Sequence, residues 1–222
     1  TRGDPLANVI DGSPVLRVSA DGVVARVVTV RPSDEGGSFF VNFGDGGAAG
    51  FPVPFHQGPR WTVSPDGERI ALLTVTIPSP REAAFRVAVV DRYGNEIFDR
   101  AYRTSTMPIP ESVVDSVISA RAESTSNSQI RSAILNDLKD RIPSMYSPVD
   151  DILLGMDGRV WVSLRPGREG NSWLVLRADG EPAMRVTLPA NIRLMVAGEE
   201  HIWGLETDEL GVESVVRHHL EI

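Results

Sequence analysis

The sequence contains no cysteine, so the chain forms neither disulfide bonds nor thiolate metal sites. It also has no run of about 18 apolar residues, and we therefore expect no membrane-spanning helix. The first twelve residues, TRGDPLANVIDG, include neither an initiator Met nor the apolar core of a signal peptide. We therefore expect a processed chain or a piece of a longer one.

The chain has fewer basic than acidic residues. Lys and Arg number 22 against 30 Asp and Glu, which gives a formal net charge of −8 across 222 residues. The arginines are interspersed with acidic residues, and no basic stripe is available to displace counterions from a phosphate backbone. Nucleic acid is therefore not an expected partner.

The strongest pattern is a repeated hairpin, in which a strand, a tight turn and a second strand follow one another. The first two copies turn at Asp-Gly pairs, which suit a two-residue turn because both central positions need positive φ. The third copy has Glu199-Glu200 at this point, which indicates drift or a longer loop. The three copies span residues 61–73, 152–162 and 194–204.

A second type of hairpin follows each copy or stands alone near the start of the chain. The sequence then divides into a half-unit at 15–30, whole units at roughly 60–103 and 150–189, and three strands at roughly 192–221. Trp161 and Trp203 are 42 residues apart, which lies in the range of propeller repeats. This spacing predicts an all-β fold, a β-propeller of four-stranded antiparallel blades.

The position of each strand within the repeat predicts that residues 1–222 form one propeller domain of about four blades. We expect the sequence to begin and to end in the middle of a blade. We expect about two further blades N-terminal to Thr1. A self-closing ring of four blades is the alternative, and it leaves the opening half-unit unexplained.

Several stretches after about residue 50 carry a family resemblance, among them PFHQGPRWTVSPDGERIALL, FRVAVVDRYGNEIFDRAYR, DGRVWVSL and IWGLETDELGVESVVRHHL. On these the chain resembles the C-terminal part of bacterial six-bladed β-propellers related to NHL-repeat and TolB-like proteins. The resemblance implies six blades and a periplasmic, secreted or envelope-associated protein. Its motifs specify a fold and not a reaction.

A helical insertion at 108–143 interrupts the strands. Apolar residues recur there at helical spacing on either side of residues 124–128, which predicts two short amphipathic helices with Asn127 or Ser128 capping the second. Pro110 suits the first turn of the first helix. The insertion joins an outer strand to the next inner strand, so we expect it to cap a ligand-binding face. Packing of the helices on blade edges is the alternative.

The stretch 33–54 includes Gly44, Gly46 and Ala49 in the spacing of a dinucleotide fingerprint. That fingerprint needs a helix directly after the glycines, and Pro52 and Pro54 forbid one. A long glycine-rich hairpin or loop is expected here instead.

Six residues near the expected loop face are candidates for ligand binding. With Arg168, the arginines among them suit an anionic ligand such as a carboxylate or sugar acid, and solvated rim charges are the alternative. The six candidates are His56, Arg60, Asp150, Asp151, Arg165 and Arg193.

No catalytic motif is present, and we therefore expect a non-catalytic binding or scaffold propeller, without a cofactor, whose partner is a protein or a small anion. The alternative is a hydrolase or lyase of gluconolactonase type. Asp150 and Asp151 precede an expected inner strand, where such enzymes place oxygen ligands for a divalent metal such as calcium. The equivalent Arg60 and Arg193 are cations, which conflicts with that alternative. The four tryptophans are expected to fill the space between blades.

Overall fold

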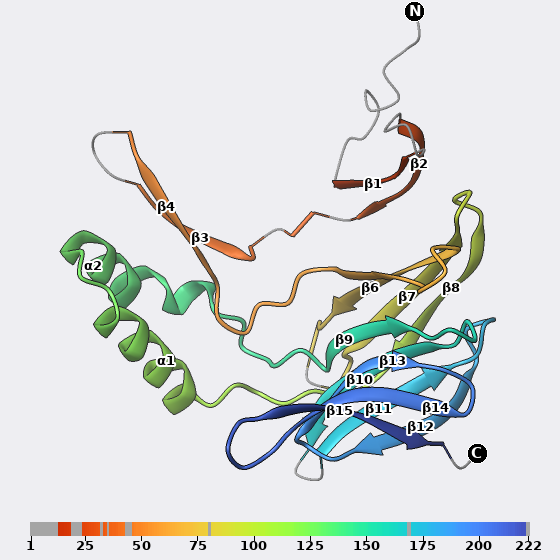
Figure 1. The fold of residues 1–222 in the computed structure, drawn as a ribbon. Coiled ribbons are helices and arrows are strands. Elements are labelled where there is room, and N and C mark those ends of the chain that lie inside the picture. Colours follow the sequence, from red (N-terminus) through yellow and green to blue (C-terminus); the bar gives the residue numbers. More distant parts are fainter. Residues whose placement is uncertain are drawn as a thin grey trace, which may run out of the picture.

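A computed structural model describes residues 13–18, 24–31, 33–34, 36–42, 46–79, 81–167 and 170–220. They form antiparallel sheets, joined by short turns, and one helical segment (Figure 1). No helix in this part of the chain is long and apolar enough to cross a membrane.

Two of the sheets have four strands, each paired with the next strand along the chain. Their limits agree with the predicted units at 60–103 and 150–189. The first sheet consists of β5 (Arg60–Val63), β6 (Arg69–Thr76), β7 (Ala84–Asp91) and β8 (Glu96–Arg103). The second consists of β9 (Val149–Leu154), β10 (Val160–Gly167), β11 (Gly170–Leu176) and β12 (Pro182–Leu188).

The remaining sheets are smaller. As predicted, the last stretch forms three strands, β13 (Ile192–Ala197), β14 (His201–Thr207) and β15 (Glu213–His219). The predicted half-unit near the start forms β1 (Ser13–Val18) and β2 (Val24–Arg31). Its Asp21-Gly22 turn lies outside the described residues.

The three larger sheets stack face to face. Successive side chains of a strand point to opposite sides, so one strand can contact a different sheet on each side. In β10, Val160 and Val162 pack with Phe85 and Val87 of the first sheet. Trp161, between them, packs instead with residues of β13 and β14. The second sheet is therefore covered on both faces, which explains the unbroken apolar run Val160–Val162 in β10.

The hairpin turns differ from the two-residue turns expected of Asp-Gly. In the turn after β9, Gly158 donates its backbone N–H to the carbonyl of Gly155, and Gly158 alone has positive φ. Asp157 contributes its carboxylate, which accepts from the N–H of Arg159. This is a longer turn ending in a left-handed glycine. The aspartate is favoured as a hydrogen-bond acceptor and not for positive φ.

The predicted pair of helices is present as α1 (Glu111–Glu123) and α2 (Ser128–Asp137), followed by a short 3-10 turn at Lys139–Arg141. Asn127 caps α2, as predicted, by accepting from the N–H groups of Gln129 and Ile130. Pro110 is the N-cap of α1 and so precedes the first turn.

The glycine-rich stretch forms a hairpin, β3 (Ser38–Asn42) and β4 (Ala48–Pro52), as expected. Ala49 lies within β4, so no helix follows the glycine pattern; Gly44 lies outside the described residues. The hairpin and the helices share an apolar core that includes Phe39, Ile118 and Ile134. The insertion therefore packs against this hairpin, to one side of the stacked sheets (Figure 1).

The prediction for the tryptophans is right for two of the four. Trp161 and Trp173 are buried between the second and third sheets. Trp61 and Trp203 are exposed by 44% and 41%. The repeat places all four in strands, but a strand residue is covered only where another sheet packs on its side.

Candidate functional site

The N-terminal ends of β5 and β9 carry most of the predicted site residues. These are the first strands of the two four-stranded sheets, and they lie in contact with each other. Gln57, just before β5, donates from Nε2 to Oδ1 of Asp150 over 3.1 Å. Nη1 of Arg60 lies 4.0 Å from Oδ1 of Asp151. Stacking of the sheets thus joins residues about ninety positions apart in the sequence.

Asp150 lies at an irregularity in the β9–β10 pairing. Asp151 is opposite Ser163 and Val149 is opposite Leu164, so Asp150 is an extra residue without an in-register partner. Such bulges redirect side chains and are common beside functional sites. The two aspartates were expected to precede the strand. They lie within it, and the bulge allows them to face Gln57 and Arg60 respectively.

Arg165, near the end of β10, is held in place by three contacts. Its Nε donates to the carbonyl of Ser147 over 3.0 Å, and its Cζ lies 4.2 Å from the ring centroid of Tyr146. Its Nη2 is 3.7 Å from Oδ1 of Asp150. These contacts hold the guanidinium of Arg165 beside the carboxylate of Asp150.

Phe55 fixes the loop that precedes β5. Its φ is 60°, and it is the only non-glycine residue with positive φ in the described part of the chain. This conformation costs on the order of 1–3 kcal/mol for a bulky residue and persists only where the surroundings enforce it. Tyr146 supplies such a contact, with the two rings 5.6 Å apart and edge to face. The strained position directly precedes His56.

His56 lies in this loop, as predicted, and is bound to a residue far from it in sequence. Its Nε2 is 2.8 Å from Oδ1 of Asp34. The His56 side chain is 24% exposed, which leaves part of the ring accessible. The arrangement ties the segment between β2 and β3 to the start of β5.

Arg193 does not join these contacts. It lies in β13, where its Nη2 is 3.7 Å from Oε1 of Glu213 on β15, and both side chains are exposed. Arg168 is outside the described residues. Arg60, Arg165 and Arg193 were assigned to loops or loop edges, but all three belong to strands, because strand pairing extends further than the turn residues indicated.

Sequence reasoning missed Asp34, Phe55, Gln57 and Tyr146. Phe55 and Gln57 lie in a stretch that carries the family resemblance, but that stretch indicated a fold and not a site, and the partners of all four residues are distant in sequence. His56 and Asp34 are 22 residues apart, and Gln57 and Asp150 are 93 apart. Only the tertiary structure identifies such partners.

The site presents charged groups and hydrogen-bonding groups from two sheets. Asp150 and Asp151 each face an arginine, so the charges are largely balanced. In the described part of the chain, no three His, Asp or Glu side chains are grouped so that they could hold a metal ion. We call the surface formed by Phe55, His56, Gln57, Arg60, Tyr146, Asp150, Asp151 and Arg165 the β5–β9 site.

Comparisons with known proteins give little beyond this geometry. No model of a protein family matches the chain, and no curated protein does. A chain from a structural and mechanistic study of two prolyl endopeptidases aligns at 14% sequence identity with a TM-score of 0.26. The alignment covers 77% of this chain and 26% of the other. A TM-score this low establishes no shared fold.

Proposed function

We propose that the chain is part of a six-bladed β-propeller that binds a ligand, without catalysis, through the β5–β9 site. Face-to-face stacking of four-stranded meander sheets, with their first strands side by side, supports the propeller. The six-bladed number rests on the family resemblance. Loops and strand ends at one rim of such a scaffold are suited to recognition.

The observation that carries the proposal is the convergence of Gln57, Arg60, Asp150 and Asp151 from two sheets. Arg60 is 44% exposed, and at 4.0 Å its pair with Asp151 is loose. Exposed pairs of this kind contribute roughly 0–1 kcal/mol, so an incoming anion can displace the aspartate at little cost. The arginine fork matches a carboxylate, which favours a small anionic ligand such as a sugar acid.

The test is a binding screen on the full chain. Calorimetry and thermal unfolding with glucuronate, galacturonate, gluconate and citrate should identify at least one compound that stabilises the protein. We expect Arg60→Gln to weaken its binding about tenfold, the effect of losing a charged hydrogen bond. Arg185→Gln, an exposed change on β12, is the matched control and should bind normally. Equal affinity in the two variants, or no binding by any compound, would contradict the proposal.

The gluconolactonase-type alternative is favoured by one observation, the placement of Asp150 and Asp151 at a bulge in a first strand. Carboxylate oxygens are the ligands that calcium prefers. Each of these carboxylates instead faces an arginine. Calcium titration and assay of gluconolactone hydrolysis distinguish the two functions. Saturable calcium binding that Asp150→Asn abolishes, together with calcium-dependent hydrolysis, would establish the alternative.

A further inference from the structure

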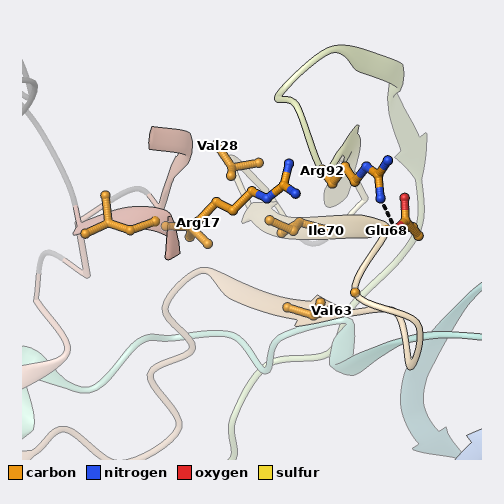
Figure 2. A pocket seen from close by; sticks show the side chains of 9 residues that line it. Arg17, Val28, Val63, Glu68, Ile70 and Arg92 are labelled. Carbon is orange, nitrogen blue, oxygen red and sulfur yellow. Dashed lines mark hydrogen bonds and ion pairs between the residues drawn. The ribbon is translucent and has the colours of Figure 1, made fainter. Parts of the chain in front are cut away.

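A cavity lies away from the β5–β9 site, between the β1–β2 sheet and the first four-stranded sheet. Its volume is about 260 Å³. Figure 2 shows the side chains that line it, including Arg17, Val28, Val63, Glu68, Ile70 and Arg92. Glu68 and Arg92 belong to the turns that follow β5 and β7, whereas the β5–β9 site lies where β5 begins.

This cavity differs in chemistry from the apolar cores between the larger sheets. The clusters that join the first sheet to the second, and the second to the third, consist of apolar residues. Here Val28, Val63 and Ile70 form an apolar wall, but two arginines and a glutamate share the space. The side chains of Arg92 and Glu68 are 39% and 46% exposed, so a ligand from solvent can reach these charges.

Arg92 is the anchored member of the arginine pair. Its Nη1 donates to Oε1 of Glu68 over 2.6 Å, and its Nη2 donates to the hydroxyl of Tyr93 over 2.7 Å. Its Nε is buried and has no hydrogen-bond partner. These hydrogen bonds turn the Arg92 guanidinium toward Glu68 and hold the pair at the edge of the cavity (Figure 2).

Arg17 reaches toward the same space from β1 (Figure 2). Its Cζ lies 5.6 Å from the ring centroid of Tyr93, and Cζ of Arg92 lies 4.8 Å from the same ring. Over the described residues, Arg17 makes no ion pair. With Glu68 balancing one arginine, the cavity keeps one unit of positive charge beside its apolar wall.

We propose that this cavity binds a small organic carboxylate, with the carboxylate at the guanidinium of Arg17, beside the Arg92–Glu68 pair, and a short apolar tail along Val28, Val63 and Ile70. The guanidinium fork is matched to a carboxylate, and a monovalent acid neutralises the excess charge. The volume is slightly below the range of drug-sized sites, about 300–1,000 Å³, which selects short acids.

Calorimetric titration of the full chain with hexanoate and with hexanamide tests the proposal. The two compounds have the same apolar tail, and only hexanoate carries a charge. We expect saturable binding of hexanoate and at least tenfold weaker binding of hexanamide. Equal affinity for the two compounds, or no binding of hexanoate, would overturn the proposal.

Substitutions show where on the chain hexanoate binds. Arg17→Met should weaken hexanoate binding about tenfold or more, and Arg17→Lys should restore part of it by keeping the charge without the fork. Val63→Phe narrows the cavity and should also weaken binding. Arg185→Met, outside the cavity, is the matched control. If it weakens binding as much as Arg17→Met does, the acid binds elsewhere.

Thermal unfolding without ligand shows whether the variants fold. We expect Arg17→Met to change the melting temperature little, because Arg17 is exposed and, over the described residues, makes no ion pair. A lower melting temperature together with unaltered hexanoate binding would assign Arg17 to packing and contradict the proposal. Arg60→Gln should not alter hexanoate binding, which separates this cavity from the β5–β9 site.

Discussion

Trp161 and Trp203 occupy the same position in the second and third sheets, yet their surroundings differ. Trp161 is 0% exposed and packs with Ile192, Leu194 and Ile202 of the third sheet. Trp203 is 41% exposed, and no further sheet among the described residues covers it. The repeat therefore sets the direction of a side chain, and the neighbouring sheet sets its burial.

The uncovered side of the third sheet keeps the character of a packing surface. Met195, Leu205 and Val215 join Trp203 around a shallow groove of about 490 Å³. Met195 and Val215 are themselves largely exposed. An exposed apolar surface of this kind favours association with other apolar surfaces. The equivalent side of the second sheet is buried against the third.

The largest expected effect is the difference in stability loss between substitutions of Trp161 and of Trp203. Trp161→Ala should lower the free energy of unfolding by about 3–5 kcal/mol, because it opens a cavity in a covered interface. Trp203→Ala should cost about 1 kcal/mol or less, because its side chain is partly in water. Urea unfolding of both variants measures the contrast. Similar losses would show that the two positions are equally covered in solution.

Trp161→Phe serves as the control for this experiment. The indole N–H of Trp161 is buried and has no hydrogen-bond partner among the described residues, so phenylalanine removes no bond seen there. Most of the lost stability should return, because an aromatic ring again fills the space.

The next effect concerns a polar contact at the edge of the covered interface between the first and second sheets. The hydroxyl of Tyr102 donates to the carbonyl of Gly180 over 2.6 Å, and the ring stacks on Phe85. Burial raises the pKa of Tyr102 to about 12. In the unfolded chain a tyrosine pKa is about 10. Between pH 10 and 12 only the unfolded state loses this proton, so stability should fall as pH rises.

Tyr102→Phe should remove the part of the fall in stability above pH 10 that comes from this group. At neutral pH it should lower the free energy of unfolding by about 0.5–1.5 kcal/mol, because the hydrogen bond is lost. Urea unfolding at pH 9, 10 and 11 measures both quantities. Tyr93→Phe, at an exposed tyrosine, is the matched control and should keep the decline seen in the wild type. An unchanged decline in Tyr102→Phe would assign it to other groups.

The smallest expected effect on stability is at the uncovered side of the third sheet. Met195→Lys and Val215→Lys should change the free energy of unfolding by about 0.5 kcal/mol or less, because both side chains already contact water. Sedimentation velocity over a range of concentrations measures whether the wild-type chain self-associates through this surface, which the two added charges should prevent. Loss of several kcal/mol would instead mean that this side is covered in the wild-type protein.

Much of the fold followed from the sequence because strands, turns and helix caps are local features. The unit limits at 60–103 and 150–189, the two helices and the cap at Asn127 all depend on residues close together in the chain. The turn geometry did not follow, since Asp157 acts through its carboxylate and only Gly158 has positive φ. An Asp-Gly pair is compatible with both kinds of turn.

The site was predictable only as a set of candidates. The sequence identified His56, Arg60, Asp150 and Asp151 by their position in the repeat. It could not show that Gln57 binds Asp150, or that Arg165 is engaged by Tyr146 and Ser147. It also grouped Arg193 with them, although that residue pairs with Glu213 in its own sheet. Side-chain partners at a strand end depend on which sheet lies beside it.

The sequence by itself determined the strands, their order and the side toward which each residue points, because alternation and turn chemistry act over a few residues. The tertiary structure decided which of those sides are covered. It buried Trp161 and left Trp203 in water, although their local sequences are alike. It also placed the helices against β3 and β4 and joined the ends of β5 and β9. These outcomes depend on contacts between distant segments, which local patterns do not specify.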